Sequence, residues 1–251
     1  SHGEQVPFSR RTSTVLASNK YRSHERAGGT SGRDGRTQAP RPLCRHYPGG
    51  VSEHYFTPGP STPTEERTHH FTIRGRDLTV TTANGVFSAD RLDKGTQVLL
   101  AHVPDPPEQG TFLDLGCGWG PISLALASAA PHATVHAVDV NERCVELTAR
   151  NAVANGLTVH AALADQALAS LRQAGTTLDL IWSNPPVRIG KRALHVLLTT
   201  WLSLLGEQGQ AWLVVQRNLG ADSLAAWLRA EGWQATRASS SKGYRVLRVT
   251  R

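Results

Sequence analysis

Three consecutive residues, Asn184-Pro185-Pro186, follow an apolar run at 178–182 and could hold an amine. Proline disfavours helical backbone angles in the residue before it and supplies no backbone donor, so the Asn184 side chain would keep a fixed direction. Its amide oxygen and a neighbouring carbonyl can accept both hydrogens of an exocyclic NH2 group, which leaves the nitrogen lone pair able to attack an electrophilic methyl group. That chemistry is N-methylation. Because Asn-Pro also starts many ordinary turns, the tripeptide alone leaves a purely structural role open.

A glycine-rich turn follows the apolar segment 111–115 and opens a helical pattern. Its glycines are Gly116, Gly118 and Gly120, so the spacing is G-x-G-x-G, whereas the dinucleotide-binding loop has G-x-G-x-x-G. Glycines let the backbone approach a ligand, and the free N–H groups of the next helix point at it. Asp114 precedes the turn and would repel a pyrophosphate. The pattern therefore favours a nucleotide-like cofactor that carries positive charge.

Asp139 ends a second apolar segment, at 133–139. An acid at this place in an α/β unit can accept hydrogen bonds from the two hydroxyls of a ribose, whichever nucleotide cofactor carries it. Asp139 could instead cap the helix that starts near Asn141. Both interpretations are open from the sequence.

Together these residues resemble the class I S-adenosylmethionine-dependent methyltransferases, and more narrowly the ribosomal RNA guanine-N2 methyltransferases of the small-subunit G1207 type. The resemblance covers about residues 53–251. Its carriers are His54-Tyr55-Phe56, 83–88, 90–100, 114–120, Asp139, Asn184-Pro185-Pro186 and Gly190. It implies an α/β fold with a doubly wound, mostly parallel seven-stranded sheet, a C-terminal antiparallel hairpin and a short N-terminal β-hairpin.

The resemblance also implies a cofactor site for S-adenosylmethionine. Gly116 and Gly118 would approach its methionine part, and Asp139 would bind its ribose. The candidate cofactor-binding residues are Phe87, Asp114, Gly116, Gly118, Asp139, Asp165 and Asn184. Of these, Phe87 would pack beside the cofactor, and Asp165 would lie near the adenine after a strand at 158–163.

The candidate catalytic residues are Asn184, Pro185 and Pro186, which would hold the guanine amine. The next residue is usually aromatic in this family and stacks on the flipped-out base, but here it is Val187. Stacking on one base is worth about 1–3 kcal/mol, so it must come from elsewhere or be weaker. The candidate substrate-binding residues are Val187, Arg188 and Lys191. The two cations could meet phosphates beside the target nucleotide, or they could form a solvated helix start.

Hydrophobic periodicity predicts the elements that position these turns. A hairpin is expected from 71–73 and 78–80, around Arg74-Gly75-Arg76-Asp77, and is expected to cover one edge of the domain. Further helices are expected at 144–154, 192–205 and 221–230, and further strands at 211–216, 233–238 and 244–249.

Length and composition agree with one folded domain at 51–251 in a chain of 251 residues. No apolar run of about 18 residues is present, so no membrane span is expected. Cys44, Cys117 and Cys144 lack C-x-x-C spacing, so neither a disulfide framework nor a metal site is predicted. We expect a cytoplasmic protein and a monomer.

The first fifty residues differ from the rest. They hold nine basic and three acidic residues, which supply +6 of the formal net charge of +7. With few large apolar side chains, residues 1–50 are expected to form a disordered basic arm, and such an arm would bind RNA phosphates. An extension without function and an organelle transit peptide are the alternatives.

The sequence thus predicts a methyltransferase that acts on the N2 amine of a guanine, with ribosomal RNA or a ribosomal subunit as its partner. Two alternatives are open. The same Asn-Pro-Pro chemistry could serve protein glutamine N5 or nucleic-acid adenine N6. A different class is a non-catalytic module that binds S-adenosylmethionine or RNA, although such a module would not need the amine acceptor.

Overall fold

The computed structural model describes residues 65–251. The basic arm predicted at 1–50 and the His54-Tyr55-Phe56 motif lie outside the described residues. The described chain starts with an antiparallel hairpin of β1 (Glu66–Ile73) and β2 (Arg76–Ala83). Arg74 and Gly75 have φ of 50° and 79° at its turn, which is the left-handed backbone that two-residue hairpin turns require.

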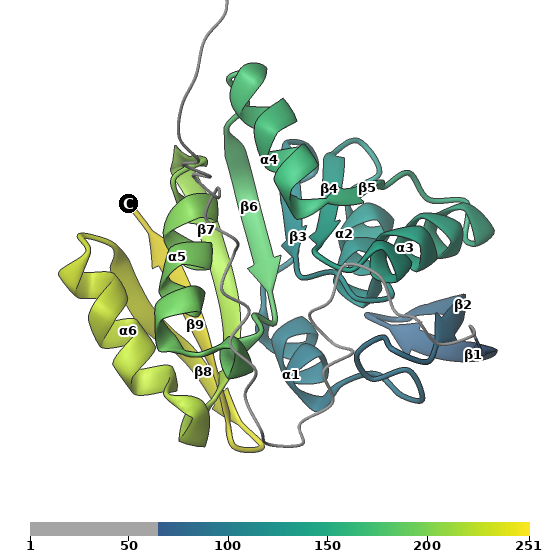
Figure 1. Ribbon diagram of the computed structural model, residues 1–251, viewed down its shortest axis with the longest axis horizontal. Helices are drawn as coiled ribbons and strands as arrows, with labels where there is room; N and C mark the ends of the chain where they lie inside the picture. The colour runs from purple at the N-terminus through teal and green to yellow at the C-terminus, as the bar shows by residue number, and fades with distance from the viewer. Residues whose placement is uncertain (1–64) are drawn as a thin grey trace, which may run out of the picture. The chain divides into compact units, whose positions relative to one another are not determined.

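The centre of the fold is a seven-stranded sheet in the order β5-β4-β3-β6-β7-β9-β8 (Figure 1). Strands β3 to β7 are parallel, and β9 runs antiparallel to both β7 and β8. The strands are β3 (Thr111–Leu115), β4 (Thr134–Asp139), β5 (His160–Leu163), β6 (Leu178–Ser183), β7 (Leu205–Gln216), β8 (Gln234–Ser241) and β9 (Tyr244–Thr250). The doubly wound sheet and its closing antiparallel hairpin are confirmed.

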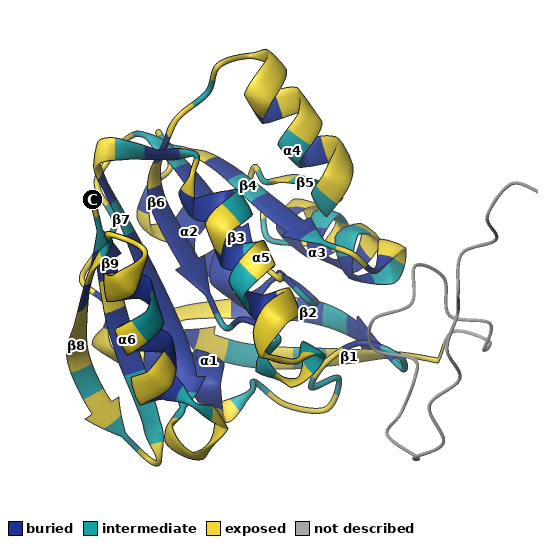
Figure 2. Ribbon diagram, turned by 60° about the vertical axis from the view of Figure 1, so that its left-hand side comes forward, coloured by how far each residue is buried: buried dark blue, intermediate teal, exposed yellow. Residues whose placement is uncertain are grey.

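Six α-helices cover the two faces of this sheet: α1 (Lys94–His102), α2 (Pro121–Ala129), α3 (Glu142–Ala154), α4 (Ala164–Gln173), α5 (Lys191–Leu202) and α6 (Ala221–Ala230). Apolar side chains of α1, α2 and α3 form one buried cluster, and those of α4, α5 and α6 form the other. Buried residues accordingly line the central strands between two helical layers (Figure 2). This double burial is why strands such as β6 read as continuous apolar runs.

The N-terminal hairpin packs on a helix, and it pairs with none of the seven strands. The Asn151 side chain accepts from the Thr81 N–H at 2.7 Å and donates to the Thr81 carbonyl at 2.9 Å. Asn155 makes the same two contacts with Thr79 at 3.0 and 2.8 Å. Asn151 of α3 and Asn155 at its C-cap therefore take the place of a neighbouring strand in bonding to β2, and the hairpin joins the α3 layer.

Two helices and the start of one strand differ from the sequence expectations. Helices α1 and α4 were not predicted, and α4 buries only Ala167 and Leu171, which is too weak an apolar stripe to recognise. Strand β7 starts at Leu205 instead of at residue 211, because Leu205 pairs with Leu178. The register then shifts between Leu178 and Leu180, and this irregularity accommodates the extra residues of β7. Within residues 65–251, no helix is both long and apolar enough to span a membrane.

Candidate active site

Three turns meet at one edge of the sheet, because β4, β3 and β6 are adjacent and parallel. The glycine turn follows β3, Asp139 ends β4, and Asn184 follows β6. The chain winds from β3 outward to β5, and then crosses back to β6 and continues the other way. The carboxyl ends of β3 and β6 thus border the point where the strand order reverses, which is the usual ligand crevice of an open α/β sheet.

The glycine turn leaves space beside its backbone. Gly116 and Gly118 have φ of 82° and 57°, a conformation that side chains other than hydrogen disfavour. A Cβ atom at either position would have no heavy atom within 4 Å. A ligand can therefore approach the main chain directly between β3 and α2.

Asp139 joins this turn to the start of α3. Its Oδ2 accepts from the Gly118 N–H and its Oδ1 from the Asn141 N–H, both at 3.0 Å. The carboxyl group is half-buried, and this burial raises its pKa. Asn141 is the N-cap of α3, since its side chain accepts from the Arg143 N–H at 3.0 Å. Because each carboxylate oxygen has a second lone pair, Asp139 can still accept bonds from a diol.

Asp114 lies behind the glycine turn and is fully buried. Its Oδ2 accepts from both the N–H and the hydroxyl of Ser123 at 2.9 Å, which fixes the first turn of α2. Burial raises the pKa of Asp114 to about 7, against the lowering effect of these two hydrogen bonds. Its Oδ1 is buried without a hydrogen-bond partner among the described residues. A cationic group bound at this turn would favour the ionised form of Asp114 through its charge.

The loop that carries Phe87 lies beside Asp139, because α3 holds it there. Asn141 donates to the Gly85 carbonyl at 3.2 Å, and Arg143 donates to the Asn84 carbonyl at 2.8 Å. Phe87 is in this loop and is 44% exposed. This loop and the glycine turn therefore lie on either side of Asp139.

Asp165 lies in the first turn of α4, directly after β5, and is exposed. Since β5 neighbours β4, Asp165 follows the next strand along the same edge of the sheet. Its Oδ1 accepts from the Gln166 N–H at 2.8 Å. Across the part of the chain that the structure describes, no three His, Cys, Asp or Glu side chains are grouped to hold a metal ion.

Asn184 is oriented by the start of α1. Its Nδ2 donates to Asp93 Oδ2 at 2.8 Å and to Thr96 Oγ1 at 3.1 Å. A carboxylate only accepts, so the amide nitrogen must face Asp93, and Oδ1 is then the group of Asn184 that can receive an amine hydrogen. The Ser183 hydroxyl donates to the Leu115 carbonyl at 2.6 Å, which ties the end of β6 to the end of β3.

Sequence reasoning missed Asp93 and Thr96. Asp93 is the N-cap of α1, and its Oδ2 accepts from the Thr96 N–H at 3.1 Å. An acid directly before a helical pattern is a cap signal that could have placed α1. Nothing in the sequence indicates that the same carboxylate also reaches Asn184, which is 91 residues away.

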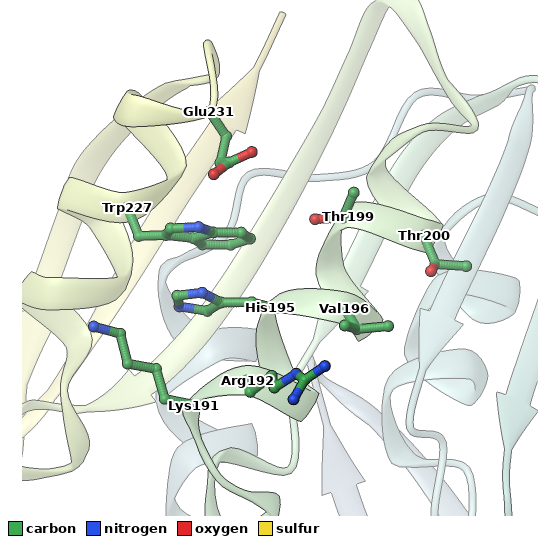
Figure 3. Close-up of a pocket in the computed structure, with 8 residues that line it drawn as sticks. All are labelled: Lys191, Arg192, His195, Val196, Thr199, Thr200, Trp227 and Glu231. Atoms are coloured by element: carbon green, nitrogen blue, oxygen red, sulfur yellow. The ribbon is translucent and has the colours of Figure 1, made fainter.

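The three substrate-binding candidates separate in space. Val187 starts a short 3-10 helix (Val187–Ile189) and packs against the apolar cluster under α5, whereas Arg188 is exposed. Lys191 begins α5 and borders a groove of about 580 Å³ between α5 and α6, where the rings of His195 and Trp227 stack with centroids 3.6 Å apart (Figure 3). The residues that line this groove do not include Asn184.

This fold and these turns define a class of protein: the Rossmann-like methyltransferases, in which a glycine turn and an acid follow adjacent parallel strands. The chain belongs to the methyltransferase small domain family, whose model matches residues 77–248. The matched range contains the cap of α1, the glycine turn, Asp139, the Asn184 turn and most of β9.

The chain is also similar in sequence to individual proteins. It is 36% identical over 199 residues to YbxB of Bacillus subtilis (strain 168), an uncharacterized protein, with 79% of this chain and 98% of YbxB covered. It is 33% identical over 163 residues to ribosomal RNA small subunit methyltransferase C of Acinetobacter baylyi, with 62% of this chain covered. The chain spans only about half of that second relative, at 48%.

A solved structure has a similar fold. The Thermus thermophilus 16S rRNA N2 G1207 methyltransferase, RsmC, in complex with AdoMet and guanosine, superposes with a TM-score of 0.64 at 25% identity. The match covers 76% of this chain and 52% of that one.

Proposed function

We propose that this protein transfers the methyl group of S-adenosylmethionine to the N2 amine of a guanine in ribosomal RNA. The observation that carries the proposal is the orientation of Asn184. Its amide nitrogen donates to Asp93 and Thr96, so Oδ1 is the acceptor at the point where the strand order of the sheet reverses. The similarity to ribosomal RNA small subunit methyltransferase C supports an RNA substrate, and the solved relative is in complex with AdoMet and guanosine. The proposed partner is ribosomal RNA or a ribosomal subunit, which the protein would bind as a monomer in the cytoplasm.

The residues at the edge of the sheet fit S-adenosylmethionine. Gly116 and Gly118 leave open space for its methionine part. Its positive charge would favour the ionised form of Asp114, which is buried behind the turn. Asp139 would accept hydrogen bonds from the ribose hydroxyls. Phe87 would pack beside the cofactor. Asp165 would lie towards the adenine. When bound, the cofactor supplies a methyl group on a sulfonium, an electrophile that needs no further activation.

The role of the chain in transfer is to position the amine. Asn184 Oδ1 accepts one amine hydrogen. The Pro185 carbonyl, which accepts from the Val187 N–H at 2.8 Å, has a second lone pair for the other hydrogen. Pro186 adds rigidity and no competing donor. The nitrogen lone pair is thereby held towards the methyl group at near-attack distance. As the new N–C bond forms and the C–S bond breaks, the nitrogen becomes acidic and releases its proton, so no strong base is required.

The test is methyl transfer from tritiated S-adenosylmethionine to ribosomal subunits, to naked ribosomal RNA and to bulk protein, followed by nucleoside analysis. We expect N2-methylguanosine in the RNA. Asn218→Ala is a matched control, because Asn218 is an exposed asparagine just after β7, at the same edge of the sheet. Label in N6-methyladenosine or in protein glutamine would contradict the guanine assignment, and binding without transfer would favour a non-catalytic module.

Removing the carboxylate of Asp93 should slow transfer without weakening cofactor binding. We expect Asp93→Ala to lower kcat by about 10- to 100-fold, because Asn184 could then turn its amide out of the productive direction. Asp93→Asn keeps one acceptor oxygen and should lose less activity. Loss of the N-cap should also cost about 1 kcal/mol of the free energy of unfolding in the alanine variant.

The matched control for this prediction is Asp90→Ala. Asp90 is in the same loop but forms an exposed ion pair with Arg67. The measurement is single-turnover kinetics together with the dissociation constant for S-adenosylmethionine. Full activity in Asp93→Ala would show that Asn184 is oriented by something other than Asp93.

A further inference from the structure

The Asn184 turn carries no aromatic ring of its own. Val187 is half-buried, and it packs on the apolar cluster beneath α5. A base taken out of an RNA stack loses its neighbours, and RNA-binding sites usually replace them with an aromatic or guanidinium plane. If the amine of a guanine is bound at Asn184, a ring from another part of the fold must lie within reach of that base.

Tyr244 is at the right edge of the sheet. It is the first residue of β9 and pairs with Gln216, the last residue of β7. Because β7 is parallel to β6 and β9 is antiparallel to it, the start of β9 lies at the edge where β6 ends. Tyr244 is therefore at the same edge as Asn184, although 60 residues of sequence separate them.

A shared neighbour shows how close the two side chains are. Gly95 lies in the first turn of α1, and a Cβ atom there would be 3.1 Å from Tyr244 Cε1 and 3.2 Å from Asn184 Nδ2. The same point would be 2.9 Å from Asp93 Oδ2. The edge of the tyrosine ring, the Asn184 amide and the Asp93 carboxylate are thus packed closely around Gly95, and a side chain at residue 95 would push them apart.

Electrostatics agree with this placement. The pKa of Tyr244 is raised, first by partial burial and then by the charge of Asp93, while the charge of Arg188 lowers it. Tyr244 therefore interacts electrostatically with Asp93, the cap of α1, and with Arg188 in the 3-10 helix that follows Asn184. At neutral pH the phenol is protonated, so it presents a neutral ring.

Other aromatic residues near the crevice are less suitable. Trp119 and Trp182 flank the two turns but are 2% and 0% exposed, so a base cannot reach them. Phe87 is exposed, but it is in the loop anchored to the start of α3, on the Asp139 side. Trp227 is stacked with His195 in the groove between α5 and α6.

We propose that Tyr244 is the stacking residue of the substrate site, which takes the purine of the target guanosine while Asn184 holds its amine. This inference rests on the proposed function. It assigns to β9 the contact that Val187 cannot make, and it leaves the exposed Arg188 to meet the adjoining phosphate.

The test measures base binding directly, with guanosine 5′-monophosphate as the probe and nuclear magnetic resonance as the readout. Tyr244 is the one tyrosine in residues 65–251, and Tyr244→Phe identifies its ring signals. We expect magnetisation transfer between the Tyr244 ring and H8 of the nucleotide. Tyr244→Ala and Tyr244→Leu should weaken nucleotide binding, and raise KM for RNA, by about 10- to 100-fold. Tyr244→Phe should stay close to the wild type, and all three variants should keep their affinity for S-adenosylmethionine.

Leucine keeps the apolar bulk of the hairpin if alanine impairs folding. Leu219→Ala is the control, because Leu219 is a 44% exposed apolar residue at the same sheet edge. Unchanged nucleotide affinity in Tyr244→Leu, or an equal loss in Leu219→Ala, would overturn the stacking role. N2-methylguanosine formed without any Tyr244 contact would overturn this inference alone. Nucleotide contact at Tyr244 without methyl transfer to RNA would overturn the proposed reaction alone.

Discussion

Replacing Asn184 with alanine should lower the rate of methyl transfer by about 10²- to 10³-fold, the usual cost of losing one oriented polar contact at a reacting centre. The amine would lose the acceptor that fixes its direction, and water would compete for its hydrogens. The dissociation constant for S-adenosylmethionine should change little, because Gly116, Gly118 and Asp139 provide the main predicted cofactor contacts. The measurement is single-turnover transfer to RNA beside cofactor titration.

Asn184→Asp gives a sharper version of the same experiment. Aspartate has nearly the same shape but cannot donate from its second oxygen, so the bond of 2.8 Å to Asp93 would become a contact between two acceptors. We expect this variant to be as inactive as alanine, and Asn218→Ala to be fully active. An active Asn184→Asp enzyme would show that the amide does not have the orientation proposed.

The free energy of unfolding should depend on pH through Asp114. Its pKa is raised from 3.8 to about 7 in the folded protein, so folding disfavours the ionised form. Its contribution to stability is therefore complete below about pH 4 and is lost as the pH rises through about 7. Asp114→Asn cannot ionise, and relative to the wild type it should gain about 2–3 kcal/mol between about pH 5 and about pH 8.

Urea unfolding of the cofactor-free protein at these two pH values measures the effect. Comparing the variant with the wild type removes the contribution of every other titrating group. Asp90→Asn, at an exposed surface pair, should show no such gain. A constant difference between wild type and Asp114→Asn across this range would mean that Asp114 is ionised at low pH in the fold.

The sequence predicted the parts of the site that depend on local chemistry. Gly116 and Gly118 were found because a tight turn with positive φ needs glycine, and Asp139 was found because an acid ends an apolar strand. Asn184 was found because proline restricts the residue before it. Each of these signals is contained within a few neighbouring residues, and the parallel sheet then brings their strand ends together.

The remaining parts depend on contacts that no local pattern records. Asp93 was not singled out, because its bond to Asn184 forms only when α1 packs beside the end of β6. Tyr244 was recognised only as the start of a strand, because its nearness to Asn184 follows from the antiparallel pairing of β9 with β7. Helix α4 was missed since it buries so little apolar surface.

The Asp93 carboxylate caps the N-terminus of α1 and also fixes the direction of the Asn184 amide. We therefore expect the smallest piece of this chain able to carry out the proposed reaction to begin before residue 93, upstream of the first strand of the seven-stranded sheet. A fragment that begins at β3 would retain both predicted cofactor-binding turns and the Asn-Pro-Pro sequence, yet its Asn184 amide would lack the Asp93 contact and would be free to rotate. In this chain, the segment before the seven-stranded sheet is thus predicted to contribute directly to the active site.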